Sequence, residues 1–471
     1  MHTTVTVIDT SSLGDRSYLI DDGHVAAVID PQRDIDRVLE LAESRGVRIT
    51  HVLETHIHND YVTGGLELAA VTGAQYVVAA ADHVHYDRHA VADGDVVRIG
   101  TFSLAVLHTP GHTHHHVSYV LRDEMNSPTG VFTGGSMLHG TTGRTDLLGD
   151  EHTTDLTHAQ FHSVRRLAAE LPDDVDVYPT HGFGSFCSAS PASGDSSTIG
   201  EQRGTNPALT HDEQHYVDDL IAGLGAYPAY YAHMGVINSS GPAPVDLSMP
   251  ARVDADELRR RIDAGEWVVD LRSRTAFAAG HLAGSLGFEL SDNFVTYLGW
   301  LYAWGAPLTL IGGDQQQILD ARRELARIGV DRITGAAVGS IDQLRADTAL
   351  RDYRVTDFHT LAATLDAGPV TLLDVRQTPE YQRAHIPAAI HIPLHELLAR
   401  IDEVPAGEVW VHCGSGYRAS IAASILDRAD RRVILVDAPF TDAVEMGLAA
   451  QTRPNSWNRQ STGIGPSEVE Q

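Results

Sequence analysis

The first 190 residues alternate short apolar, β-branched runs with polar loops, and each run has a length typical of a single strand. Helical patterns are expected at 34–44 and again at 211–224. Strands interleaved with helices predict an α/β fold. The expected strands cover residues 25–30, 50–56, 75–80, 102–107, 130–134 and 175–181.

A change in composition separates this region from the rest of the chain. Residues 188–200 are rich in Ser, Gly and Pro and are typical of a loop, and N-S-S-G-P-A-P at 238–244 is typical of a linker. We therefore place a first domain at 1–245, in which the last helical part is an extension. The length of 471 residues agrees with about three domains at roughly 150 residues each.

The rest of the chain contains a diverged internal repeat, V-V-D-L-R-S-R-T-A-F-A-A-G-H-L-A-G-S in the middle and L-L-D-V-R-Q-T-P-E-Y-Q-R-A-H-I-P-A-A near the end. Two α/β domains of one fold are therefore expected in tandem. The matched pairs are Asp270 with Asp374, Arg272 with Arg376 and His281 with His385. The expected boundaries are 251–347 and 354–458, with a disordered tail at 459–471.

The net charge of −29 argues against nucleic acid and acidic lipid as partners, because both carry negative phosphates. The sequence contains no run of the ~18 apolar residues that a membrane helix needs, and its N-terminus lacks the pattern of a secretion signal. We therefore expect a cytoplasmic protein, and a homo-oligomer is compatible with the sequence. Two cysteines, Cys187 and Cys413, are too few and too far apart for a disulfide framework.

The run E-V-W-V-H-C-G-S-G-Y-R-A-S-I-A-A-S-I-L around Cys413 predicts a strand, a glycine-rich loop and a helix. A cysteine at the strand end faces backbone N–H groups and the positive end of the helix dipole, and both stabilise a thiolate. Arg418 adds a fixed positive charge that can hold an anion. The alternative is a buried cysteine that only packs. The candidate catalytic residues are thus Cys413 and Arg418, and the candidate substrate-binding residues are Gly414, Ser415, Gly416 and Tyr417.

These features resemble the rhodanese family, through Leu373–Arg376, Glu380–Tyr381, His385–Pro387 and the loop 413–418. The resemblance implies that Cys413 accepts sulfane sulfur as a persulfide and passes it on. A loop of four residues between Cys413 and Arg418 is shorter than in the cysteine-dependent phosphatases and suits a single sulfur atom. The middle repeat resembles the same fold but has Gly312 or Gly313 in place of the cysteine, so we expect a structural role for it.

Histidines gather after the expected strands of the first domain. His-x-His-x-Asp at 56–60, T-P-G-H-T with His112, F-T-G-G-S around Gly135 and Y-P-T-H with His181 could converge at one edge of an α/β sandwich. A lone histidine is usually a surface or capping residue, but this clustered pattern predicts a metal site.

The segments resemble the metallo-β-lactamase fold, an αββα sandwich, and more narrowly the persulfide dioxygenases fused to rhodanese domains. The narrower resemblance rests on G-R-T-D at 143–146, H-G-F-G-S-F-C at 181–187 and P-A-Y-Y-A-H-M at 228–234. It implies oxidation of a low-molecular-weight persulfide to sulfite at one non-haem iron, with sulfur exchanged among persulfide, sulfite and thiosulfate. It also assigns Arg144 to substrate binding.

Two positions depart from the wider pattern. Hydrolases of the superfamily place a histidine where this chain has Tyr61, and a phenol is a poor zinc ligand at neutral pH, so we expect one metal ion. Family members complete the iron site with an aspartate where this chain has Gly135. We expect His56, His58 and His112 to hold the ion, with iron as the expected metal and zinc as the alternative. Substitution by Asp60 or a water, or a dead site, are further possibilities.

Three functional hypotheses remain open from the sequence. The first is persulfide oxidation together with sulfur transfer at Cys413. The second is a zinc hydrolase resembling glyoxalase II with an added rhodanese domain, against which Tyr61 and Gly135 both count. The third is a metal-free persulfide-binding module that leaves Cys413 as the only active centre. Cys187 could lie near the substrate or be an ordinary buried thiol.

Overall fold

The computed structural model describes residues 3–190, 192, 194–345, 347 and 349–451. The chain divides into two compact units, one of Met1–Ser273 with Phe288–Asp347 and the other of Arg274–Gly287 with Thr348–Gln471. The middle repeat therefore contributes to both units, and the three expected domain boundaries stay a prediction. The expected tail at 459–471 lies outside the described residues. Among the residues that are described, no helix combines the length and apolarity needed to cross a membrane.

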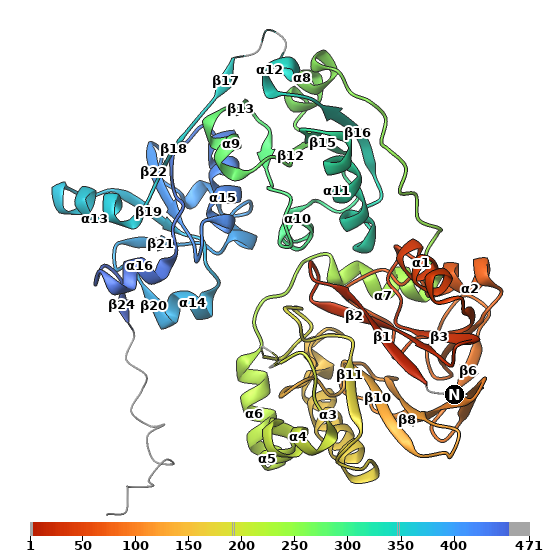
Figure 1. Cartoon of the computed structure of the whole chain (residues 1–471). Helices are drawn as coiled ribbons and strands as arrows, with labels where there is room; N and C mark the ends of the chain where they lie inside the picture. The colour runs from red at the N-terminus through yellow and green to blue at the C-terminus, as the bar shows by residue number, and fades with distance from the viewer. Residues whose placement is uncertain (1–2, 191, 193, 346, 348, 452–471) are drawn as a thin grey trace, which may run out of the picture. The chain divides into compact units, whose positions relative to one another are not determined.

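Two sheets form the centre of the first unit (Figure 1). Six strands make the first sheet in the order β1-β2-β3-β4-β5-β6, and five make the second in the order β11-β10-β9-β8-β7. The first sheet consists of β1 Thr4–Thr10, β2 Asp15–Asp21, β3 Val25–Ile29, β4 Arg48–Leu53, β5 Gln75–Ala79 and β6 His89–Val91. The second consists of β7 Val96–Ile99, β8 Phe102–His108, β9 Val117–Arg122, β10 Pro128–Gly134 and β11 Asp176–Pro179.

The sheets pack face to face because alternate residues of their strands are apolar. A buried cluster that includes Tyr18, Leu53, Leu104 and Phe132 fills the space between them. Two further clusters join each outer sheet face to its helices. The helices are α1 Asp36–Arg45, α2 Gly65–Thr72, α3 Asp150–Glu170, α4 Ile199–Thr205, α5 Pro207–Thr210 and α6 Glu213–Gly223. The predicted αββα sandwich is confirmed.

The stretch expected to be a linker at 238–244 begins instead inside a helix, α7 (Tyr231–Ser240). Asn238 is buried, its amide nitrogen donates to the carbonyls of His58 and Tyr61, and its amide oxygen accepts from Thr63 N. The linker prediction was wrong for these first residues, because a buried asparagine that satisfies three backbone groups stabilises a helix that composition alone does not indicate.

The middle repeat adds a parallel sheet in the order β12-β15-β16 to the first unit. A buried ion pair joins its longest helix to the sandwich, since Arg327 Nη2 lies 2.7 Å from Asp34 Oδ2. Arg323 also pairs with Asp34 and with Asp36. The elements are α8 Ala255–Asp263, β12 Trp267–Asp270, α10 Phe294–Leu301, β15 Leu308–Gly312, α11 Gln315–Arg327, β16 Ile333–Val338 and α12 Ile341–Leu344.

The second unit contains a five-stranded parallel sheet in the order β18-β23-β22-β19-β21 (Figure 1). The predicted parallel α/β architecture of the last repeat is therefore confirmed. Short antiparallel pairs join β13 to β17 and β20 to β24. The strands are β13 His281–Leu282, β14 Leu286–Gly287, β17 Leu350–Arg351, β18 Arg354–Thr356, β19 Thr371–Asp374, β20 Ala384–His385, β21 Ala389–His391, β22 Glu408–His412, β23 Arg432–Val436 and β24 Ala450–Gln451. The helices are α9 Arg274–Ala279, α13 Phe358–Ala367, α14 Thr378–Arg383, η1 Leu394–Glu396, η2 Ile401–Glu403, α15 Tyr417–Arg428 and α16 Phe440–Glu445.

A buried histidine of the middle repeat belongs to this second unit. His281 contacts the Phe277 carbonyl through Nδ1 at 2.9 Å and Asp427 of α15 through Nε2 at 3.1 Å. Since α15 begins at the predicted nucleophile loop, the segment 274–287 of the middle repeat is packed against the element that carries this loop.

Candidate functional site

Three buried histidines meet where strands of the two sandwich sheets end. His56 follows β4, His112 follows β8 and His181 follows β11. One ring nitrogen from each lies within 4.8 Å of the others, a spacing that allows all three to bind one metal ion. The structure thus brings together two of the three expected ligands, His56 and His112, and adds His181, which the pattern indicated only as a candidate.

Each of these imidazoles is oriented by a contact of its Nδ1 atom. His56 Nδ1 lies 2.8 Å from Thr55 Oγ1 and His112 Nδ1 lies 2.7 Å from the Arg144 carbonyl oxygen. His181 Nδ1 lies 2.9 Å from Asp15 Oδ1 and 3.1 Å from Asp60 Oδ2. Metal-binding histidines are commonly fixed in this way, because the contact at one nitrogen leaves the lone pair of the other free for the ion.

The Nε2 atoms of the same rings face one another. His56 Nε2 and His181 Nε2 are 3.3 Å apart, and within the described residues His112 Nε2 is buried without a hydrogen-bond partner. An unpartnered polar atom in the interior is costly unless a ligand satisfies it. The residues present therefore fit a metal ion.

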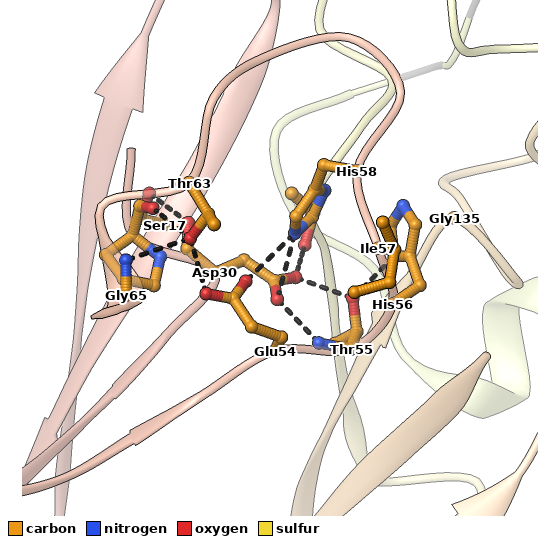
Figure 2. A network of polar contacts seen from close by, with 12 residues as sticks. Ser17, Asp30, Glu54, Thr55, His56, Ile57, His58, Thr63, Gly65 and Gly135 are labelled. Atoms are coloured by element: carbon orange, nitrogen blue, oxygen red, sulfur yellow. Dashed lines mark hydrogen bonds and ion pairs between the residues drawn. The ribbon is translucent and has the colours of Figure 1, made fainter. Parts of the chain in front are cut away.

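His58 has different surroundings (Figure 2). Its Nε2 atom lies 3.2 Å from Glu54 Oε2, 3.3 Å from Asp30 Oδ1 and 3.0 Å from the Tyr61 hydroxyl. Burial alone would lower the pKa of His58, but Asp30 and Glu54 raise it to about 9. His58 shares a second possible metal-binding group with Asp60 and His181, and not the first group with His56 and His112. Its role as a ligand stays a prediction.

The histidines of the first group differ in charge. Burial lowers the pKa of His112 to about 3 and that of His56 well below its ordinary value. Both rings are therefore neutral at neutral pH, and each can offer a nitrogen lone pair to a metal ion. Burial also opposes charge on His181, but Asp60 and Asp15 raise its pKa to about 10. The same two carboxylates favour a metal cation at His181 Nε2, because the cation supplies the positive charge in place of the proton.

Tyr61 is fully buried and cannot serve as an anionic ligand. Its hydroxyl donates to the Asp30 carbonyl at 3.2 Å, and burial raises the pKa of Tyr61 well above its ordinary value. The number of metal ions in the site stays a prediction.

Gly135 brings no side chain to the site, and its backbone faces two histidines. Its N–H donates to His116 Nε2 at 3.1 Å. A Cβ atom at this position would lie 2.3 Å from His112 Cδ2. The ring of His112 therefore fills the space that a side chain at 135 would need.

The predicted strand, loop and helix around Cys413 are confirmed, and we call residues 413–418 the sulfur-transfer loop. Cys413 follows β22, and its Sγ accepts from Gly416 N at 3.2 Å, immediately before α15 begins. The thiol is only 1% exposed, although Ser415 in the same loop is exposed. The sulfur thus faces a backbone donor at the positive end of a helix, as the sequence predicted.

Arg418 is half-buried in the first turn of α15. Its guanidinium pairs with Glu380, with Nη1 2.5 Å from Oε2 and Nη2 2.8 Å from Oε1. A Cβ atom at Gly414 would be 3.0 Å from Arg418 Nη2, so the charge rests against the loop backbone. Tyr417 is buried as the first residue of α15.

Comparisons with known proteins agree with this geometry. The metallo-beta-lactamase superfamily profile matches residues 13–181, which include His56, His58, His112 and His181, and the rhodanese-like domain profile matches residues 357–443, which include Cys413. Human mitochondrial persulfide dioxygenase ETHE1 is 30% identical over 246 residues, covering 52% of this chain and 82% of the relative. The chain belongs to the persulfide dioxygenase family.

Two further relatives and one solved structure are also similar to this persulfide dioxygenase family member. The Bos taurus persulfide dioxygenase ETHE1 is 30% identical over 250 residues and is covered to 82%. A crystal structure described as a metallo-beta-lactamase from Staphylococcus aureus is 30% identical with a TM-score of 0.65, and the match covers 72% of this chain and all of that one. The hydroxyacylglutathione hydrolase of Polaromonas sp. is 34% identical over 161 residues, which cover 34% of this chain and 57% of that enzyme. The chain is an enzyme of persulfide and sulfur chemistry.

Arg144 and Cys187 of this family member are both buried. The predicted substrate ligand Arg144 is buried and binds Asp146, the Phe186 carbonyl and the Gly225 carbonyl, while its own carbonyl orients His112. It therefore positions a candidate metal ligand, and its substrate contact stays a prediction. Cys187 is fully buried, and burial raises the pKa of its thiol well above the ordinary value.

His181, Asp15 and Asp60 are the residues that sequence reasoning ranked too low. The motif that contains His181 was visible, but nothing in the sequence distinguished it from His58 as a ligand. Asp15 carried no local signal, because it lies on β2 and reaches His181 only through the fold.

Proposed function

We propose that the enzyme oxidises a low-molecular-weight persulfide, such as glutathione persulfide, to sulfite at a single metal ion and transfers sulfane sulfur at Cys413. Iron is the metal expected for the first reaction and zinc the alternative. The converging ring nitrogens of His56, His112 and His181 in a persulfide dioxygenase family member are the observation that carries the proposal. When bound, the metal supplies the centre at which oxygen and the persulfide react.

The protein groups around this centre prepare it in two ways. Burial keeps His56 and His112 neutral and ready to bind a cation. Asp15 and Asp60 hold the His181 ring and place negative charge behind it. The same burial restricts water around the reacting groups, which strengthens every electrostatic contact within the site.

The sulfur-transfer loop would act on thiosulfate or another sulfane-sulfur donor. The Cys413 thiolate attacks the outer sulfur of thiosulfate, a new S–S bond forms, the old S–S bond breaks, and sulfite leaves with the electron pair. The Gly416 N–H contact and the α15 dipole stabilise the negative charge on sulfur before and after transfer. A thiol or cyanide then accepts the outer sulfur and regenerates the Cys413 thiolate.

Two assays test these activities separately. Iron-replete enzyme should consume oxygen on addition of glutathione persulfide and form sulfite, and the absence of oxygen uptake would refute the dioxygenase proposal. Thiosulfate:cyanide sulfurtransfer should be lost in Cys413→Ser, and survival of this activity would refute the role of Cys413. Cytoplasmic location and homo-oligomer formation also stay predictions.

A zinc hydrolase is a second candidate because the hydroxyacylglutathione hydrolase relative shares the sandwich half and because His58, Asp60 and His181 form another possible metal-binding group. Elemental analysis of enzyme purified without added metal separates the alternatives. Two zinc ions per chain would favour the hydrolase, whereas a chain without metal would favour the persulfide-binding module.

A further inference from the structure

We infer that His181 takes the place of the carboxylate that Gly135 lacks, so that His56, His112 and His181 form an all-histidine metal site. The inference rests on the proposed single-metal function and specifies its ligands. It differs from the set of His56, His58 and His112 that the sequence predicts.

Position 135 is closed to a side-chain ligand in this structure. A Cβ atom there would lie 2.3 Å from His112 Cδ2 and 2.5 Å from His112 Cγ, distances far below van der Waals contact. Gly143 contributes to the same packing, because a Cβ there would lie 2.7 Å from His112 Nδ1. The His112 ring is therefore set between two glycines. The absence of a carboxylate at position 135 and the position of the His112 ring depend on each other, because the ring could not lie here beside an aspartate.

His181 has the position and the support that a replacement ligand needs. Its Nε2 lies 3.3 Å from His56 Nε2. Two nitrogens that each lie about 2.0–2.1 Å from one zinc ion are separated by roughly 3.0–3.4 Å, so the observed distance suits a shared ion. Asp15 and Asp60 flank the opposite nitrogen of the ring. In the family, the negative charge lies on the aspartate ligand itself. In this chain, it lies on Asp15 and Asp60, which contact the ligand His181.

The Nε2 atom of His58 contacts residues outside the group of His56, His112 and His181. These residues are Asp30, Glu54 and Tyr61, and the Nδ1 atom of His58 is buried and unpartnered within the described residues. His58 itself belongs to the group with Asp60 and His181. A metal ion held by His56 and His112 therefore leaves His58 outside the first group. Its contacts assign it to stabilising the loop between β4 and α2.

Metal binding by the full-length protein tests the ligand set without any measurement of activity. Anaerobic titration with Fe²⁺, and with Co²⁺ as a probe whose visible spectrum reports nitrogen ligands, should give one site per chain. His181→Ala should weaken binding by more than about 100-fold, whereas His58→Ala should change it by less than about threefold. His181→Gln serves as a second variant, and circular dichroism checks that each variant is folded.

Gly135 provides the sharper comparison. Gly135→Ala adds only a methyl group, which displaces the His112 ring, and should weaken binding by at least about tenfold. Gly135→Asp should fail to restore affinity above that of the unmodified protein. Tighter metal binding in Gly135→Asp, or full binding by folded His181→Ala, would overturn the inference. If one metal binds as expected but no oxygen is consumed, the ligand set stands and the proposed oxidation fails.

Discussion

The shape of the sulfur-transfer loop depends on Gly416, and Gly416→Ala tests whether that shape is needed for sulfur transfer. Gly416 has a φ of +91°, a conformation that favours glycine, and its N–H points at Cys413 Sγ. An added Cβ would lie 1.8 Å from Asp437 Oδ1 and 3.2 Å from the Asp437 Cα atom. The carboxylate could rotate away, but the Cα belongs to the backbone, so the loop itself must move.

The expected effect follows from these contacts. A residue other than glycine in this backbone region costs about 1–3 kcal/mol locally. A hydrogen bond to a charged group contributes about 1.5–3 kcal/mol, so loss of the Gly416 contact to the thiolate corresponds to about a 10- to 150-fold fall in rate. Movement of Asp437 would also disturb its ion pair with Arg274, whose Nε lies 3.0 Å from both carboxylate oxygens.

The assay is kcat/KM for thiosulfate:cyanide sulfurtransfer, with urea unfolding measured on the same samples. Gly313→Ala is the matched control, since Gly313 follows the corresponding strand of the middle repeat and an added Cβ would meet only Gln317 Oε1, at 3.9 Å. The control should keep both activity and stability. A folded Gly416→Ala enzyme whose kcat/KM stays within about threefold of the unmodified enzyme would refute the reasoning, because the lost charge-assisted contact predicts at least about tenfold.

Cys413→Ser should abolish thiosulfate:cyanide transfer and leave oxygen uptake with glutathione persulfide unchanged; loss of both would contradict two separate centres. Arg327→Ala should lower the free energy of unfolding in urea by about 1.5–3 kcal/mol, because it removes a charge-assisted contact of buried Asp34 while Arg37 and Arg323 still pair with this carboxylate. Burial would raise the pKa of Asp34, but Arg327 lowers it, so this stabilisation is complete above the unfolded pKa of about 4 and fades as pH falls further. A difference between unmodified and Arg327→Ala protein that stayed constant to low pH would contradict this origin. Arg274→Ala should raise the KM for thiosulfate, because it leaves the charge of Asp437 unneutralised beside the sulfur-transfer loop; Arg274→Lys should restore part of the affinity, and an unchanged KM would refute the role.

Much of the fold could be predicted because its signals are local. Apolar runs marked the strands of the sandwich, and the recurrence of Asp270 and Asp374 at corresponding strand ends marked two related sheets. Local signals could not predict that the sandwich and most of the middle repeat form one compact unit. The ion pair between Asp34 and Arg327 joins residues 293 positions apart, and composition carries no record of such a contact.

The candidate site could also be predicted only in part. The sequence indicated histidines and strand ends, but not which ring nitrogens share one space. His58 and His56 are separated by one residue, yet Glu54 and Asp30 occupy the Nε2 side of His58, while the Nε2 of His56 faces His181. Choosing between two histidines of one motif requires the positions of carboxylates from other strands, and these positions follow from the packing of the sandwich.

The two repeats share a strand, a loop and a helix but differ at the residue that precedes the helix. In the middle repeat, the N-cap residue before α11 is Asp314, whose carboxylate accepts from Gln317 N and so satisfies the positive end of this helix. In the last repeat, the N-cap residue before α15 is Gly416, which provides no side chain, and the Gly416 N–H is directed at Cys413 Sγ instead. The helix terminus in the last repeat is thereby left to stabilise a charge on sulfur, whereas in the middle repeat a fixed carboxylate already holds that position. Restoring a cysteine at Gly312 or Gly313 alone should therefore not create a sulfurtransferase, because the thiolate would meet the charge of Asp314 where Cys413 meets a backbone donor.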